Sequence, residues 1–322
     1  RNFNPDGKIK MVHLSNQKLP AAHRIKGMTP SVEVTAELGA GLKAISAGLK
    51  GHRAPRQVLD KTRLVRNLHD ADLKAAVANP GSGRFKPQSV MNELRKALDQ
   101  GASKGEKAMV FGDVGLNKGY LTQWLKVARP GEVMVHNGMS TLGIALPQAV
   151  GAKLANPRLK VVSVSGDGGL MMNVQEVATA AREKLPLVSL VLMDQSLGLI
   201  QNHQRRNALK PSGVDLPALN IKALARGLGA RGVVIKDARQ IAPAVRKALA
   251  ANKPTIIGIP VDYAEAHARA DKMGQAATKK AAAKKTTAKK TTANKTTAKK
   301  VQVRQASAKK APVRTKSRVR TS

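Results

Sequence analysis

The chain has 322 residues, which is enough for two domains of ordinary size, and a formal net charge of +37. It contains no cysteine, which excludes disulfide bonds, thiolate metal sites and cysteine nucleophiles. It also has no run of 18 or more apolar residues that would predict a transmembrane helix. We therefore expect a cytoplasmic protein without a membrane partner.

The positive charge is unevenly distributed. Residues 276–322 hold 16 lysines or arginines and no acid, so they contribute +16 and leave +21 on residues 1–275. A balance of this kind bears on solubility and on polyanion binding, and it carries no information about the fold.

The first part of the chain predicts only a piece of a domain. Strands are expected at residues 8–14 and 31–35, followed by a helix at 36–49 that has leucines and an isoleucine on one face. Two strands and one helix cannot enclose a core, so we interpret residues 1–52 as the C-terminal remnant of a middle domain. Residues 53–86 are polar, have helical spacing and end in a glycine-rich loop, which predicts a connector.

Residues 87–268 alternate between apolar strand patterns and helical patterns, which predicts an α/β domain. Crossover helices of this length join parallel strands, so the expected fold is a doubly wound parallel sheet. The strands are predicted at residues 107–111, 133–136, 161–164, 187–192, 233–235 and 255–260, and the longer helices at residues 87–98, 148–155, 170–184, 221–228 and 238–250.

The stretch from residue 161 to 198 carries the clearest chemical signal. A short β-branched strand ends at Gly-Asp-Gly-Gly, a helix follows, and a second apolar strand ends at Asp194. Asp167 and Asp194 are 27 positions apart, and the intervening crossover would bring both to the carboxyl ends of neighbouring strands. Open α/β sheets bind their ligands at that edge.

Two carboxylates beside glycines suit a magnesium ion that carries a diphosphate, because Mg²⁺ prefers oxygen ligands and usually completes its shell with phosphate oxygens. The glycines allow a close approach of the backbone. An ordinary α/β turn, in which Asp167 only caps the following helix, has the same local pattern. The order of strand, helix and strand between the two aspartates favours the metal site.

This arrangement resembles the signature of the thiamine-diphosphate-dependent enzymes, in which Gly-Asp-Gly is followed by a helix, a strand and an Asn-Asn pair. Met193-Asp194 stands in place of that pair, as in the catabolic, flavin-independent acetolactate synthases. The resemblance implies thiamine diphosphate and Mg²⁺ as cofactors, without FAD. It also implies Asp167, Asp194 and the backbone carbonyl of Ser196 as the metal ligands.

The same resemblance implies further cofactor-binding residues. The turn after the first strand of the domain is similar to the segment that faces the diphosphate, and the block at residues 137–147 is similar to the segment beneath the cofactor. There, a bulky apolar residue bends the cofactor, and a glycine lets a carbonyl approach its pyrimidine ring. The residues implied in this way are Gly115, Leu116, Asn117, Gly138, Leu142, Gly168 and Gly169.

The resemblance extends from about residue 8 to the Pro-Val-Asp-Tyr sequence at 260–263. It implies an acetolactate-synthase-like subunit that decarboxylates pyruvate and joins the product to a second 2-keto acid, in a homodimer or tetramer. The family's catalytic glutamate lies in an N-terminal domain without a counterpart here, so we expect no catalytic residue of that kind and no activity from this chain alone. Another thiamine-dependent decarboxylase or carboligase, or a non-catalytic nucleic-acid-associated protein, is the alternative.

The end of the chain is a different kind of sequence. From residue 281 it repeats in four units of five, AAAKK, TTAKK, TTANK and TTAKK, without a large apolar residue in the repeats. Residues 269–322 are therefore predicted to be a disordered basic tail, similar to the tails of linker histones. Residues 276–322 could bind nucleic acid or another polyanion without reading its sequence, or could only aid solubility.

Overall fold

The computed structural model describes residues 12–18, 30–53, 55–101 and 107–275. The chain divides into two compact units, residues 1–69 and 70–322. The predicted polyanion-binding segment at 276–322 and the beginning of the first predicted strand lie outside the described residues. None of the described helices combines the length and the apolar composition that a membrane span requires.

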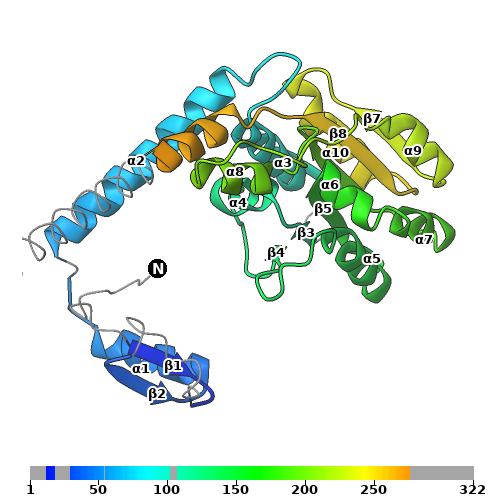
Figure 1. Ribbon diagram of the computed structural model, residues 1–322. Coiled ribbons are helices and arrows are strands. Elements are labelled where there is room, and N and C mark those ends of the chain that lie inside the picture. The colour runs from blue at the N-terminus through cyan, green and yellow to red at the C-terminus, as the bar shows by residue number, and fades with distance from the viewer. Residues whose placement is uncertain (1–11, 19–29, 54, 102–106, 276–322) are drawn as a thin grey trace, which may run out of the picture. The chain divides into compact units, whose positions relative to one another are not determined.

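The first unit contains a small parallel sheet and a helix (Figure 1). Strand β1 (Val12–Ser15) pairs in parallel with β2 (Val32–Thr35), and α1 (Leu38–Gly48) follows β2. Glu37 caps α1, because its carboxylate accepts hydrogen bonds from two N–H groups of the first turn. No residue of α1 is buried.

A long helix, α2 (Arg56–Ala78), contains the boundary between the two units. The sequence predicted helical spacing for this segment. Ala76 is the one buried residue of α2. The boundary falls inside the predicted connector 53–86. The predicted domain limits themselves stay predictions.

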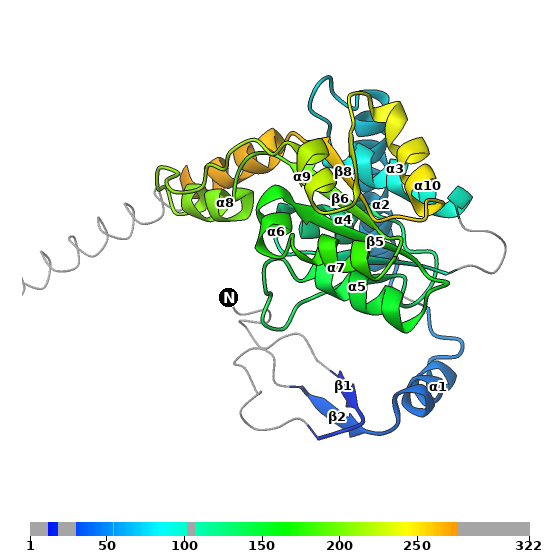
Figure 2. The ribbon, with the colours of Figure 1, turned by 90° about the vertical axis from the view of Figure 1, so that its right-hand side faces the viewer.

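The second unit is built on a six-stranded, fully parallel sheet, which confirms the predicted fold class (Figure 2). The strand order is β4-β3-β5-β6-β8-β7. The strands are β3 (Ala108–Gly112), β4 (Val133–Val135), β5 (Lys160–Gly166), β6 (Val188–Met193), β7 (Arg231–Val234) and β8 (Thr255–Pro260).

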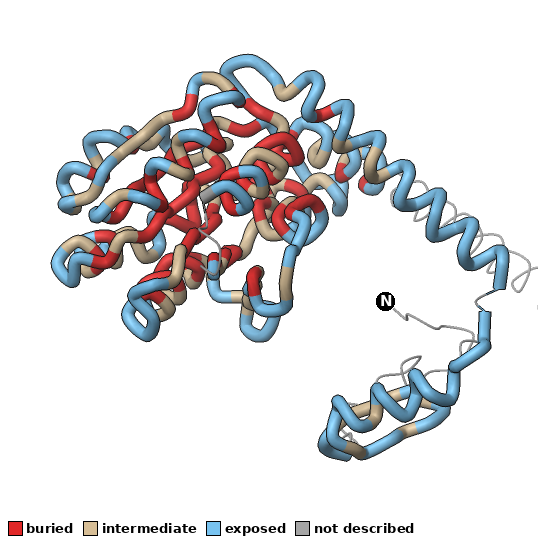
Figure 3. Tube along the Cα trace, turned by 180° about the vertical axis from the view of Figure 1, so that it is seen from behind, coloured by how far each residue is buried: buried red, intermediate tan, exposed pale blue. Residues whose placement is uncertain are grey.

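Helices cover both faces of this sheet, and apolar side chains of successive strand residues point to opposite faces. Val162 and Val164 of β5 pack under one layer of helices, whereas Val161 packs under the other. Figure 3 shows the buried residues concentrated along these strands. The first layer contains α3 (Pro87–Gly101), α4 (Leu116–Trp124) and α10 (Ile241–Leu249), and the second contains α5 (Ala145–Ala155), α7 (Glu176–Arg182) and α9 (Ile221–Gly227).

The strand order places a crevice between β3 and β5. The chain leaves β3 toward α4, on one face of the sheet, and leaves β5 toward α7, on the other face. Because the two connections depart in opposite directions, the backbone opens between them at the carboxyl ends of the strands. This is the topological switch point at which open α/β sheets bind ligands.

The structure differs from the predicted helix at residues 170–184. Instead of one helix it has α6 (Asp167–Met172) and α7, separated at Asn173. Asparagine is a weak helix former. The break places the Asn173 side-chain amide where it donates a hydrogen bond to the carbonyl of Gly143, at 3.1 Å.

Order also extends beyond the predicted start of the tail. Residues 264–275 form a helix, so residues 269–275 do not belong to a disordered segment. Ala270 in this helix is fully buried, and Asp271 forms an ion pair of 2.9 Å with Arg205 of α8 (Gly198–Arg206). These contacts to distant residues explain why the local composition did not predict the helix.

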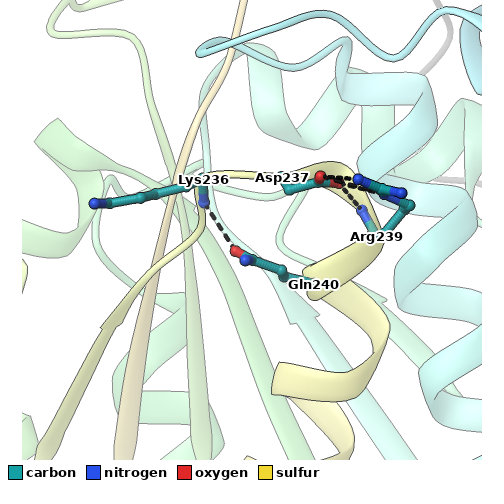
Figure 4. Close-up of polar contacts among 4 residues, drawn as sticks. All are labelled: Lys236, Asp237, Arg239 and Gln240. Atoms are coloured by element: carbon teal, nitrogen blue, oxygen red, sulfur yellow. Dashed lines mark hydrogen bonds and ion pairs between the residues drawn. The ribbon is translucent and has the colours of Figure 1, made fainter.

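The edge strand β7 ends in a turn held by its own side chains (Figure 4). Asp237 caps the short 3₁₀ helix Ala238–Gln240 by accepting the N–H of Arg239, and its carboxylate also pairs with the guanidinium of that residue at 2.6 Å. Gln240 accepts the N–H of Lys236. The turn leads directly into α10 and is separate from the crevice.

Candidate functional site

The two aspartates that the sequence singled out lie at the ends of adjacent strands. Asp167 follows β5 and Asp194 follows β6, and these strands pair with Gly166 opposite Leu192. Asp167 accepts the N–H of Gly168 with Oδ1, at 2.9 Å, and the N–H of Gln195 with Oδ2, at 2.7 Å. Asp167 therefore links the loop after β5 to the loop after β6. This goes beyond the alternative in which it only caps the following helix.

Two buried oxygens beside Asp167 lack partners. Among the described residues, neither Oδ2 of Asp194 nor Oγ of Ser196 has a hydrogen-bond partner. A buried, unsatisfied carboxylate oxygen is costly, so it marks a place where a ligand or ion completes the structure. No cluster of three His, Cys, Asp or Glu side chains with metal-binding geometry occurs in the described part of the chain. A cation held by this pair would thus need oxygens from a bound ligand.

The electrostatics of the pair also favour a cation. Burial, and then the negative charge of Asp167, raise the pKa of Asp194 to about 7. Burial raises the pKa of Asp167 as well, against hydrogen bonds from backbone N–H groups. Two desolvated carboxylates close together resist ionisation, and a divalent cation between them removes that repulsion.

A cavity of about 180 Å³ lies beside Asp167 and Asp194, and nearly all of the predicted site residues line it. Of the ten residues predicted, Gly138 alone does not line it. That glycine is exposed in the loop after β4. The predicted residues that line the cavity are Gly115, Leu116, Asn117, Leu142, Asp167, Gly168, Gly169, Asp194 and Ser196, and the roles predicted for all ten remain predictions.

Two helices begin at the cavity. Gly115, Leu116 and Asn117 at the start of α4 and Gly198 at the start of α8 all line it. Neither helix has a side-chain cap at its N-terminus. The first N–H groups of a helix have no partner within it and carry partial positive charge, so these two ends provide donors for an anion. The Asn117 side chain is itself turned inward, donating to the carbonyl of Asp113 at 2.9 Å.

Glycines keep the walls of the cavity close together. A Cβ on Gly168 would lie 2.8 Å from Cδ2 of Leu197, and one on Gly198 would lie 2.8 Å from Oδ2 of Asp194. A Cβ on Gly169 would collide with the carboxylate of Asp113. Side chains at these positions would fill the space between the two carboxylates and the helix ends.

Asp113, which directly follows β3, holds two segments of the chain together beside the cavity. Its carboxylate is fully buried and accepts the N–H of Val114 at 2.8 Å and that of Gly143 at 2.9 and 3.0 Å. It thereby fixes the segment that carries Leu142 to the end of β3. Gly143, with φ of +90°, lies so close to α6 that a Cβ would be 2.6 Å from Cβ of Met172. Asp113 therefore positions one wall of the cavity without lining it.

Several lining residues were missed from the sequence. Most are apolar, and Tyr263, which follows β8, is the largest. It belongs to the Pro-Val-Asp-Tyr sequence at 260–263, but nothing in that pattern links it to Asp194, which lies 69 positions earlier. The missed residues are Val114, Gly166, Leu192, Leu197, Gly198, Leu199, Ile200 and Tyr263.

Comparisons with known proteins agree with this geometry. Residues 113–259 match the family model "Thiamine pyrophosphate enzyme, C-terminal TPP binding domain". An acetolactate synthase of Bacillus subtilis (strain 168) is 30% identical over 264 residues, which cover 82% of this chain and 44% of that protein. A catabolic acetolactate synthase of Raoultella terrigena is 34% identical over 151 residues, covering 47% of this chain and 27% of that protein.

A solved structure shares the fold. It is the thiamine diphosphate-dependent 4-hydroxybenzoylformate decarboxylase of Rhodococcus jostii RHA1, with a TM-score of 0.50 and 26% identity over 57% of this chain and 34% of that one. The chain thus spans less than half the length of these relatives. The matched region contains both aspartates, every residue that lines the cavity except Tyr263, and the strands β4 to β8 apart from the last residue of β8, whereas β3 ends just before it. The chain is therefore similar to acetolactate synthases, and its residues 113–259 match the C-terminal TPP-binding domain of the thiamine pyrophosphate enzymes.

Proposed function

We propose that the cavity at the switch point binds the diphosphate of thiamine diphosphate together with a magnesium ion. One observation carries this proposal: two desolvated carboxylates, one of them with an unpartnered oxygen, share a cavity with two uncapped helix N-termini. The carboxylates suit the cation, and the helix ends suit the anion. A diphosphate bound through magnesium places the cation and the anion in the same cavity.

The residues of the chain have separate roles in this proposal. Asp167 and Asp194 hold the cation with the carbonyl of Ser196, and Gly168 and Gly169 let the backbone approach the diphosphate. Leu142, whose segment is fixed by Asp113, provides an apolar wall that orients the rest of the cofactor. When bound, thiamine diphosphate supplies the carbanion chemistry that decarboxylates a 2-keto acid. The apolar lining excludes water around it.

Acetolactate synthesis from pyruvate is the reaction we propose for the complete enzyme, because the acetolactate synthases are 30–34% identical to this chain. The named decarboxylase among the solved structures, at 26% identity, supports the alternative of a different 2-keto acid decarboxylase. We propose a homodimer or tetramer as the working form. Polyanion binding by residues 276–322 is a separate proposal that rests on their charge alone.

The 322 residues alone should bind the cofactor but form no acetolactate, since they correspond to only 44% of the Bacillus subtilis relative. The test incubates the purified chain with pyruvate, thiamine diphosphate and Mg²⁺, and measures acetolactate and acetaldehyde. We expect neither product above the level of a reaction without protein. Clear turnover without another polypeptide would contradict the claim that a further part is needed, and the product would identify the reaction.

A further inference from the structure

Tyr263 is the one aromatic residue that lines the candidate site within the described chain. It follows β8, and only 4% of its surface is exposed. Its ring packs against Tyr120 of α4, with ring centroids 5.3 Å apart and planes tilted by 39°. This packing fixes the ring, so the direction of the phenol group is set by the core rather than by solvent.

The position of Tyr263 between two cavities is informative. A second cavity, of about 490 Å³ and lined by polar residues, lies beside the first. Among the residues that the structure describes, only Asp194, Ser196 and Tyr263 line both cavities. Tyr263 is thus part of the wall that also contains the two oxygens without partners, Oδ2 of Asp194 and Oγ of Ser196.

The phenol group of Tyr263 has no hydrogen-bond partner among the described residues. No hydrogen bond joins it to any residue in the described ranges, although almost the whole side chain is buried. Burial first, and then the negative charge of Asp194, raise the pKa of Tyr263 well above its usual range. A phenol is protonated at neutral pH even without this shift, so the group can act as a hydrogen-bond donor.

Donors are scarce in the first cavity. No lysine, arginine or histidine of the described ranges lines it. The Asn117 amide donates to backbone carbonyls, and the carboxylates of Asp167 and Asp194 are acceptors. Apart from the helix N-termini, the side-chain donors that remain are the hydroxyls of Ser196 and Tyr263. These two hydroxyls are the side-chain donors that an anionic ligand in this space could use.

We propose that the phenol of Tyr263 donates a hydrogen bond to a diphosphate oxygen of the ligand held by Asp167 and Asp194. This inference rests on the proposed function, and it adds a binding residue from β8 to a site otherwise formed by segments after β3, β5 and β6. The ring of Tyr120 holds the phenol in place from the side of α4.

The test compares Tyr263→Phe with the matched control Tyr120→Phe. Each variant removes one hydroxyl from the same ring pair, but Tyr120 does not line the cavity. Isothermal titration calorimetry of the full chain at pH 7.5 would measure the Kd for thiamine diphosphate in saturating Mg²⁺, and separately the Kd for Mg²⁺ alone. We expect Tyr263→Phe to raise the Kd for thiamine diphosphate on the order of tenfold or more, because a hydrogen bond to a charged group is lost. The Tyr120→Phe variant should keep the wild-type Kd.

Each other outcome has a distinct meaning. Absence of binding by the wild-type chain would overturn the proposed function. Wild-type affinity in Tyr263→Phe, or equal losses in both variants, would overturn this inference and leave the proposed function standing. An equal loss of affinity for Mg²⁺ alone would also overturn it, since the phenol would then act on the metal's own shell. Thermal unfolding of each variant shows that the fold is kept.

Discussion

Replacing Asp194 by asparagine should stabilise the metal-free protein and abolish its Mg²⁺ binding. Folding raises the pKa of this carboxyl from about 3.8 to about 7, so the native state holds a proton that the unfolded chain releases. The metal-free protein therefore keeps its full stability below the unfolded pKa of this carboxyl and loses stability as the pH rises through the folded pKa. Asparagine does not ionise, so the variant avoids this loss. The full shift corresponds to about 4 kcal/mol at pH 7.5. Because the asparagine amide is itself buried and offsets part of this, we expect a gain of about 2 kcal/mol, or roughly 5 °C in Tm.

Differential scanning calorimetry in EDTA, from pH 4 to pH 8, measures this effect. The difference in Tm between Asp194→Asn and wild type should be small at pH 4 and should grow toward pH 7.5. Asp72→Asn is the matched control, because Asp72 is exposed on α2, and it should show no such growth. A lower Tm for Asp194→Asn at pH 7.5 would contradict the assignment of Asp194 as a carboxylate that is stabilised by a cation.

Replacing Asp113 by alanine should destabilise the domain and weaken cofactor binding at the same time. The substitution leaves the buried N–H groups of Val114 and Gly143 without an acceptor and frees the segment that carries Leu142. We expect a loss of about 2–4 kcal/mol in the free energy of unfolding, because buried hydrogen bonds to a carboxylate are broken. Urea denaturation measures this loss.

Asp72→Ala is the control for Asp113→Ala, since Asp72 is exposed on α2 and lines neither cavity. The control should lose less than 1 kcal/mol or so. The Kd of the Asp113→Ala variant for thiamine diphosphate should rise at temperatures at which the variant is still folded. Unchanged stability would show that other contacts hold the segment.

The sequence could place the candidate site residues that are close together in the chain, although their roles remain predictions. The strand, crossover helix and strand between Val161 and Met193 form one supersecondary unit, and its right-handed connection brings Asp167 and Asp194 to adjacent strand ends. The glycines beside Asp167 belong to the same unit. Spacing within one unit is enough to place such residues, because few topologies satisfy it.

The parts that the sequence did not reveal depend on contacts between distant segments. Asp113 binds Gly143, 30 positions later, and Tyr263 reaches the cavity from the last strand of the sheet. The helix at residues 264–275 is ordered by Arg205 and by burial of Ala270, neither of which its own composition shows. These features depend on tertiary contacts, which local propensity cannot predict.

Binding of thiamine diphosphate to the full chain, measured by isothermal titration calorimetry with Mg²⁺ and again with EDTA, tests the proposed cofactor site directly. We expect binding by the wild-type chain in Mg²⁺ with about one site per chain, no binding in EDTA, and no binding by Asp167→Ala in either condition. Equal affinity in Asp167→Ala and wild type, or affinity independent of Mg²⁺, would contradict the proposed site.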